Sequence, residues 1–156
     1  MFKSSIPFST QSFDPLALDN QFCFALYSAS LAMTKTYKPF LDKLGLTYPQ
    51  YLVMLVLWQQ DDVLVKAIGE KLFLDSGTLT PLLKRLEASS LIARTRDEAD
   101  ERQVRITLTR EGRALKKKAQ CIPQQVLRAS GHPPEALALL REQLSAIRND
   151  LAKTNN

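Results

Sequence analysis

Residues 74–108 read LDSGTLTPLLKRLEASSLIARTRDEADERQVRITL, and this stretch decides the fold. Its first half carries leucines at helical spacing, which predicts an amphipathic helix that runs to about Ser90 (Leu79, Leu82, Leu83 and Leu86). The helix is expected to follow a turn at 74–77 and to start at Ser76 or Thr78. Pro81 is best tolerated in the first turn of a helix, which favours a start near Thr78.

The second half of this stretch changes its period from helical to two. Residues 91–96 and 103–108 alternate like strands, and the charged segment 97–102 separates them, which predicts a β-hairpin with an exposed tip. A short helix is expected at 66–73, before the turn. Helix, turn, helix and hairpin in this order predict a winged helix-turn-helix over residues 47–108.

Two helices are expected before this unit. The first covers residues 16–44 and is amphipathic, and Pro39 should bend it or end a segment there. Gly45 is suited to the end of this helix, and Thr47 to the cap of a second, almost wholly apolar helix at 49–60. The next apolar segment, 63–65, is long enough for a single rung of sheet.

Two helical segments are also expected after the hairpin. Thr109 caps the first, Pro123 kinks or interrupts it, and an amphipathic helix covers residues 134–153. The chain is therefore predicted to be mainly α with a small β-hairpin wing. Its 156 residues suit a single domain.

The net charge of +5 is concentrated in one part of the chain. Residues 66–118 contain 13 Lys and Arg against 8 Asp and Glu, and the remainder is neutral. A basic module on a neutral scaffold is typical of nucleic-acid binders, and a solvated basic face without a partner is the alternative.

Hydropathy argues against a membrane protein. No apolar run approaches the roughly 18 residues that a membrane span needs, and the Ser-, Thr- and Pro-bearing N-terminal tail lacks the basic and apolar regions of a leader. We expect no membrane partner and a cytoplasmic location.

The helix after the turn carries the residue types that read DNA. Opposite its leucines lie hydroxyls suited to base edges and cations suited to phosphates (Ser76, Thr78, Thr80, Lys84 and Arg85). The hairpin loop is too acidic for a simple phosphate clamp. We expect Asp100 to orient an arginine, with Arg94 as the candidate, and Arg102 to enter a minor groove.

The segment 74–87, followed by Asp100-Glu101-Arg102, resembles the MarR family of winged-helix regulators. Within that family it is similar to the OhrR branch, the repressors that sense organic hydroperoxides. The N-terminal half agrees through FCFALYSA at 22–29 and through Tyr37 and Tyr48. The resemblance covers nearly the whole chain.

The resemblance implies a sensing thiol at Cys23. In the branch this cysteine lies at a dimer interface and is held by tyrosines of the partner subunit, which correspond here to Tyr37 and Tyr48. The residues themselves place Tyr27 one helical turn from Cys23, and a phenol can donate a hydrogen bond to a thiolate. Without the resemblance, Cys23 would be interpreted as a small buried hydrophobe.

Cys121 departs from the pattern of the branch. Two-cysteine members carry a resolving cysteine nearer the position of Arg128, so Cys121 is either a resolving thiol or an inert core thiol. Both cysteines are expected to be free, and no cofactor or metal site is predicted, because neither has a close Cys or His neighbour. His132, the single histidine, is interpreted as a turn residue.

The resulting hypothesis is a homodimeric repressor that oxidation releases from DNA, and not an enzyme. Segments 16–45 and 109–153 would form the dimer, and two winged helices would bind a double-stranded, pseudo-palindromic operator. An organic hydroperoxide would convert Cys23 to a sulfenic acid, which condenses with a protein thiol or a small-molecule thiol.

Two alternatives stay open. A MarR-type repressor could instead be induced by a lipophilic or phenolic ligand that binds between helices, with Cys23 passive. A thiol peroxidase would use Cys23 catalytically, but it leaves the hydroxyl-bearing helix and the charged loop without a role.

Overall fold

The computed structural model describes residues 13–155, so the N-terminal tail lies largely outside the described residues. The chain divides after Lys35 into two compact units. A short 3-10 helix, η1 (Leu18–Asn20), precedes α1 (Phe22–Asp42). The expectation of one helix from residue 16 was wrong, because Gln21 is extended and separates the two.

Helix α1 runs through Pro39 to Asp42, so the proline does not end it. A proline lacks the amide N–H and so costs one helical hydrogen bond, and α1 nevertheless continues for three residues after Pro39. Gly45 then adopts a left-handed conformation, with φ of 68°, as expected for a helix stop. The amide of Leu46 donates to the Leu41 carbonyl across this turn.

Helix α2 (Tyr48–Gln59) is the centre of the hydrophobic core. Thr47 caps it as predicted: its hydroxyl accepts from the Gln50 amide, while the Gln50 side chain accepts from the Thr47 amide. Five of its apolar residues are buried (Tyr51, Val53, Met54, Val56 and Leu57).

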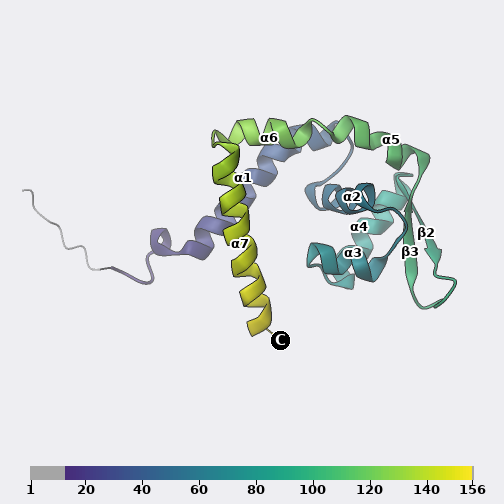
Figure 1. Cartoon of the computed structure of the whole chain (residues 1–156), viewed down its shortest axis with the longest axis horizontal. Coiled ribbons are helices and arrows are strands. Elements are labelled where there is room, and N and C mark those ends of the chain that lie inside the picture. The colour runs from purple at the N-terminus through teal and green to yellow at the C-terminus, as the bar shows by residue number, and fades with distance from the viewer. Residues whose placement is uncertain (1–12, 156) are drawn as a thin grey trace, which may run out of the picture. The chain divides into compact units, whose positions relative to one another are not determined.

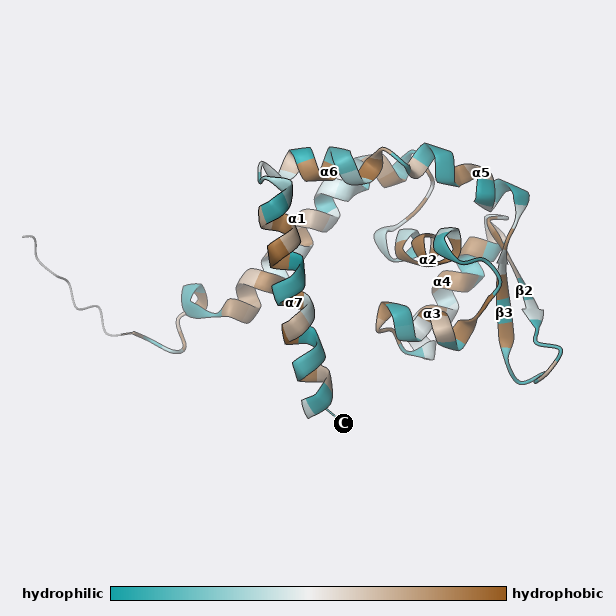
Figure 2. Cartoon of the chain, in the orientation of Figure 1, coloured by the Kyte–Doolittle hydropathy of each residue, from teal (hydrophilic) through white to brown (hydrophobic). Residues whose placement is uncertain are grey.

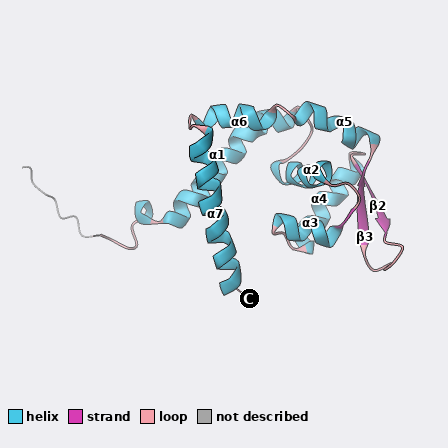
Figure 3. Ribbon diagram, in the orientation of Figure 1, coloured by secondary structure: helices cyan, strands magenta, loops and turns pink. Residues whose placement is uncertain are grey.

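The predicted winged helix-turn-helix is formed by β1 (Val63–Leu64), α3 (Val65–Leu72), α4 (Ser76–Ala88), β2 (Ile92–Arg96) and β3 (Val104–Leu108). The three strands are antiparallel in the order β1-β3-β2, and Ile106 of β3 pairs with Val63 on one side and Arg94 on the other. Figure 1 shows α2, α3 and α4 gathered beside the hairpin, and Figure 3 shows its two strands.

Helix α4 starts at Ser76, the earlier of the two expected positions, and not near Thr78. The turn predicted at 74–77 ends at Asp75, whose carboxylate accepts from the Thr78 amide at 2.7 Å and caps a helix that begins at Ser76. Pro81 therefore lies inside the helix rather than in its first turn. An aspartate cap on the first turn and three buried leucines stabilise α4 despite the proline (Leu79, Leu83 and Leu86).

Three further helices follow the hairpin: α5 (Arg110–Ala119), α6 (Ile122–Ser130) and α7 (Pro134–Thr154). Thr109 caps α5 by accepting from the Gly112 amide at 3.0 Å. Pro123 stands in the first turn of α6, which confirms the predicted interruption. No described helix is long and apolar enough to cross a bilayer.

Helix α5 packs closely on the loop before β2 and is hydrogen-bonded to α2. A Cβ at Gly112 would overlap the Leu91 carbonyl, so only glycine lets α5 approach the loop before β2 this closely. The indole of Trp58 donates to the Gly112 carbonyl at 2.9 Å, and Lys116 donates to the Trp58 carbonyl at 2.9 Å.

Candidate nucleic-acid interface and thiol site

The outer face of α4 is polar and open. Three of its four leucines are buried against the core, whereas four of its polar side chains are exposed (Ser76, Thr78, Lys84 and Arg85). Thr80 is half-buried, and its hydroxyl donates to the Ser76 carbonyl at 2.7 Å. Its oxygen can still accept a hydrogen bond, but its donor is already used inside the helix.

At the wing tip an aspartate holds an arginine outward. Asp100 Oδ1 accepts from both the backbone amide and Nε of Arg102 at 3.1 Å, while the Arg102 side chain remains 91% exposed. These hydrogen bonds, first among them the one from the Arg102 side chain, lower the pKa of Asp100. The carboxylate therefore stays ionised and keeps the guanidinium in place.

The expectation that Asp100 orients Arg94 was wrong. Arg94 Nε donates to Glu87 at the end of α4, at 2.7 Å, and both side chains are about one third exposed. The cause is the strand geometry, because β2 packs on α4 and Arg94 lies on that strand, away from the tip.

Another arginine, Arg105, connects the wing to the body, and the sequence did not single it out. Arg105 on β3 donates from Nε to Asp62 at 2.8 Å and from Nη1 to Asp97 at 2.9 Å. The hydrogen bond from Arg105 lowers the pKa of Asp97, and both aspartates raise the pKa of Arg105. Asp62 and Arg105 are 43 residues apart, so spacing in the sequence offers no signal for this pair.

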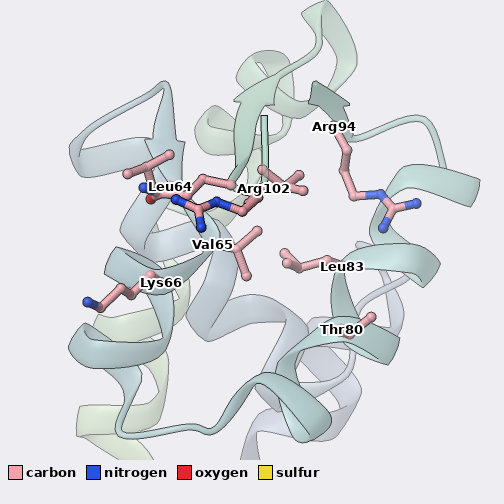
Figure 4. A pocket seen from close by; sticks show the side chains of 9 residues that line it. Leu64, Val65, Lys66, Thr80, Leu83, Arg94 and Arg102 are labelled. Atoms are coloured by element: carbon pink, nitrogen blue, oxygen red, sulfur yellow. The ribbon is translucent and has the colours of Figure 1, made fainter. Parts of the chain in front are cut away.

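Between the wing and α4 lies a groove of about 390 Å³. Its floor is apolar and its rim carries Lys66, Thr80, Arg94 and Arg102. In Figure 4, Lys66 and the Arg102 guanidinium stand on one side, and Thr80 and Leu83 of α4 on the other. The Lys66 side chain is 81% exposed, and its Nζ lies 4.0 Å from Glu70, so its charge remains available.

The two tyrosines implied by the resemblance lie together. The ring centroids of Tyr37 and Tyr48 are 4.9 Å apart, and Tyr51 lies 5.7 Å from Tyr37. Burial first, and then Tyr48 and Tyr51, raise the pKa of Tyr37 to about 12. These phenols are therefore neutral O–H donors near neutral pH. The spacing of Tyr48 and Tyr51, three residues apart on α2, could have indicated the third phenol.

Cys23 and Cys121 are both free and exposed. Cys23 lies in the first turn of α1, one turn before the exposed Tyr27. Cys121 stands between α5 and α6, next to the basic segment Lys116–Lys118. The expectation that Cys121 could be an inert core thiol does not match this exposed position. Among residues 13–155 no group of three His, Cys, Asp or Glu is placed to hold a metal ion.

Large apolar side chains are exposed along two helices of the single chain. On α1 they include Phe22, Phe24, Leu26 and Leu31, and on α7 they include Leu139, Leu140, Ile147 and Leu151. Figure 2 shows the repeated hydrophobic bands on α7. Residues of this kind are usually covered by a partner.

Comparison with known proteins gives one consistent result. A family model described as transcriptional regulator SarA/Rot matches residues 35–119. The organic hydroperoxide resistance transcriptional regulator of Bacillus subtilis is 51% identical over 143 residues, which cover 92% of this chain and 97% of that protein.

Solved structures of similar proteins support the same relationship. A structure of reduced AbfR bound to DNA is similar with a TM-score of 0.72 and 36% identity, over 86% of this chain and 94% of that chain. A structure of disulfide-formed AbfR has a TM-score of 0.61 and 37% identity, over 83% and 91%. These relatives are regulators rather than enzymes. The chain therefore belongs to the MarR family of winged-helix transcriptional regulators, in the branch that contains the organic hydroperoxide resistance regulator.

Proposed function

We propose that this regulator is a dimeric repressor that binds its operator when Cys23 is reduced and leaves it when an organic hydroperoxide oxidises Cys23. The observation that carries the DNA-binding half of the proposal is the open polar face of α4 beside a wing arginine held outward by Asp100. A recognition helix and a wing in this arrangement suit a major groove and the adjacent minor groove.

The contacts divide into two kinds. Ser76, Thr78 and the acceptor oxygen of Thr80 read base edges, while Lys84 and Arg85 bind phosphates. Arg102 enters the minor groove. Because one sugar-phosphate strand separates a major groove from its neighbouring minor groove, that strand lies over the groove between α4 and the wing, within reach of Lys66.

Two copies are needed to cover the exposed apolar faces of α1 and α7. Segments 16–45 and 109–153 form the dimer in this proposal, and a twofold axis presents two α4 helices to successive major grooves. The operator is then a pseudo-palindrome. A regulator of chromosomal DNA acts in the cytoplasm, which we propose as its location.

The sensing step is a nucleophilic displacement. The Cys23 thiolate attacks the distal oxygen of the hydroperoxide, the O–O bond breaks, and the alkoxide leaves and takes a proton from solvent. The resulting sulfenic acid condenses with Cys121 or with a small-molecule thiol and releases water. Before oxidation, Tyr37 and Tyr48 of the partner subunit donate to the thiolate, and loss of these hydrogen bonds shifts the dimer to a state that does not fit the operator.

The supporting comparison is a relative for which both a reduced DNA-bound structure and a disulfide-formed structure are known. Induction by a phenolic ligand is the second candidate, and it has less support because the relatives in this branch are named for hydroperoxide resistance or redox state. A thiol peroxidase has no support among the relatives.

Substitution of Cys23 by serine tests the proposal. Serine preserves volume but cannot form a sulfenic acid, so the variant should bind an operator duplex, selected from random sequence with the reduced parent, as tightly as the parent does. Cumene hydroperoxide should release the parent and leave Cys23→Ser bound in a fluorescence anisotropy titration. Cys121→Ser removes only the candidate resolving thiol, so with a small-molecule thiol present it should still be released. Equal release of Cys23→Ser and parent would transfer the sensing role to a bound ligand.

A further inference from the structure

The wing tip is connected to the body of the protein by a continuous chain of hydrogen bonds. Arg105 binds the side chain of Asp62 through Nε and the Asp62 carbonyl through Nη2, at 2.8 and 2.9 Å. Its third nitrogen, Nη1, reaches Asp97 at the base of the loop. Each of the three nitrogens of this guanidinium therefore donates one hydrogen bond inside the protein.

The series of hydrogen bonds continues from Asp97 to the wing tip. The second oxygen of Asp97 accepts from the Asp100 amide at 3.2 Å, and the Asp100 carboxylate holds Arg102. Asp97 is the best shielded member, with its side chain 13% exposed, and Arg105 is 33% exposed, whereas Arg102 is 91% exposed. The shielded side chains of Asp97 and Arg105 therefore fix the position of the exposed Arg102 side chain.

We propose that Arg105 is a positioning residue for the minor-groove contact: it fixes Asp97, and through Asp97 and Asp100 it sets where Arg102 meets DNA. This rests on the proposed function. In this proposal Arg105 acts through the aspartates and not through a DNA contact of its own, because each of its three nitrogens already donates to Asp62 or Asp97. The left-handed backbone of Asp62, with φ of 56°, holds its carbonyl and its carboxylate toward the same guanidinium.

A direct DNA contact and a positioning role give different results in a double-mutant cycle. Arg105→Lys keeps the positive charge but lacks the fork that reaches two aspartates. It should lower operator affinity by roughly tenfold, as expected for members of one hydrogen-bond network. In an Arg102→Ala background the same change should have less than about a twofold effect, because no ordered guanidinium remains to be positioned.

A second measurement does not depend on DNA. In the parent, the Nε–H of Arg102 should exchange with solvent more slowly than that of an arginine side chain without a partner, as measured by NMR, since it donates to Asp100. Arg105→Lys and Asp97→Asn should both accelerate this exchange. Arg113→Lys is the matched control, because Arg113 pairs with the neighbouring Asp61 at 2.8 Å but has no hydrogen bond to the loop.

The outcomes separate the two proposals. If the parent selects no duplex, the proposed function fails. If the parent binds but Arg105→Lys and Arg102→Ala are additive, Arg105 acts independently of Arg102 and the positioning role is wrong. Unchanged Arg102 exchange in Arg105→Lys, with the parent's urea midpoint retained, would also overturn it.

Discussion

Replacement of Lys66 by alanine measures whether a sugar-phosphate strand lies over the groove beside α4. The Lys66 side chain is 81% exposed, and its distance of 4.0 Å from Glu70 is too long for a tight pair, so a full charge faces the groove. Each phosphate that a protein neutralises on B-DNA adds about 0.9 to the slope of log affinity against log salt concentration, so a dimer that loses two such contacts should lose roughly 1.8.

The expected effect on affinity follows from that slope. Counterion release alone, taken from a reference of about 1 M salt, predicts a loss of roughly 20-fold at about 200 mM salt and roughly 200-fold at about 50 mM. Fluorescence anisotropy with a labelled operator across this range of KCl gives both quantities. The loss should be the same on a random duplex, because a phosphate contact carries no sequence information.

Lys38 offers a matched control. It is also an exposed lysine with an acidic residue four positions later, Asp42, at 2.8 Å, but it lies on α1 rather than in the groove. Lys38→Ala should retain the parental slope. A Lys66→Ala slope equal to that of the parent would refute the path proposed for the strand.

Three other predictions concern stability and sensing. Gly112→Ala should lower the free energy of unfolding by about 3 kcal/mol, seen as a lower urea midpoint, because its methyl group overlaps the Leu91 carbonyl; an unchanged midpoint would contradict the packing. Tyr37→Phe should slow hydroperoxide oxidation of Cys23, measured by mass spectrometry, without abolishing it. Folding raises the pKa of Tyr37 to about 12, so its contribution to stability is complete below pH 10 and declines as the pH rises toward 12; Tyr37→Phe should lose this dependence. Cys121→Ser should abolish any disulfide-linked species on non-reducing electrophoresis, whereas a parent protein that appears only as a mixed disulfide with an added small thiol would assign the second thiol to that small molecule.

Local signals predicted most of the fold. Capping at Thr47 and Thr109, the stop at Gly45 and the break before Pro123 each depend on a few neighbouring residues, and all four are as expected. The preference for Thr78 over Ser76 as the start of α4 was wrong because Pro81 was given more weight than Asp75, whose carboxylate caps a helix that begins two residues earlier.

The site was less predictable because its ion pairs join distant segments. The sequence marked Asp100 and Arg102 as wing residues, but Arg94 was expected as the partner of Asp100, whereas the structure pairs Asp100 with Arg102. That pairing depends on which face of β2 meets α4. Arg105 was treated only as part of a strand, since Asp62 is brought to it by the pairing of β1 with β3.

The junction of α2 with α5 gives the protein a built-in optical probe. Trp58 is the single tryptophan of the chain, and its indole N–H is bound to the Gly112 carbonyl of α5. Indole emission shifts when such a hydrogen bond is lost or when water reaches the ring. The fluorescence of the unlabelled protein therefore reports on the joint between the helix that carries Tyr48 and Tyr51 and the helix that leads to α6 and α7.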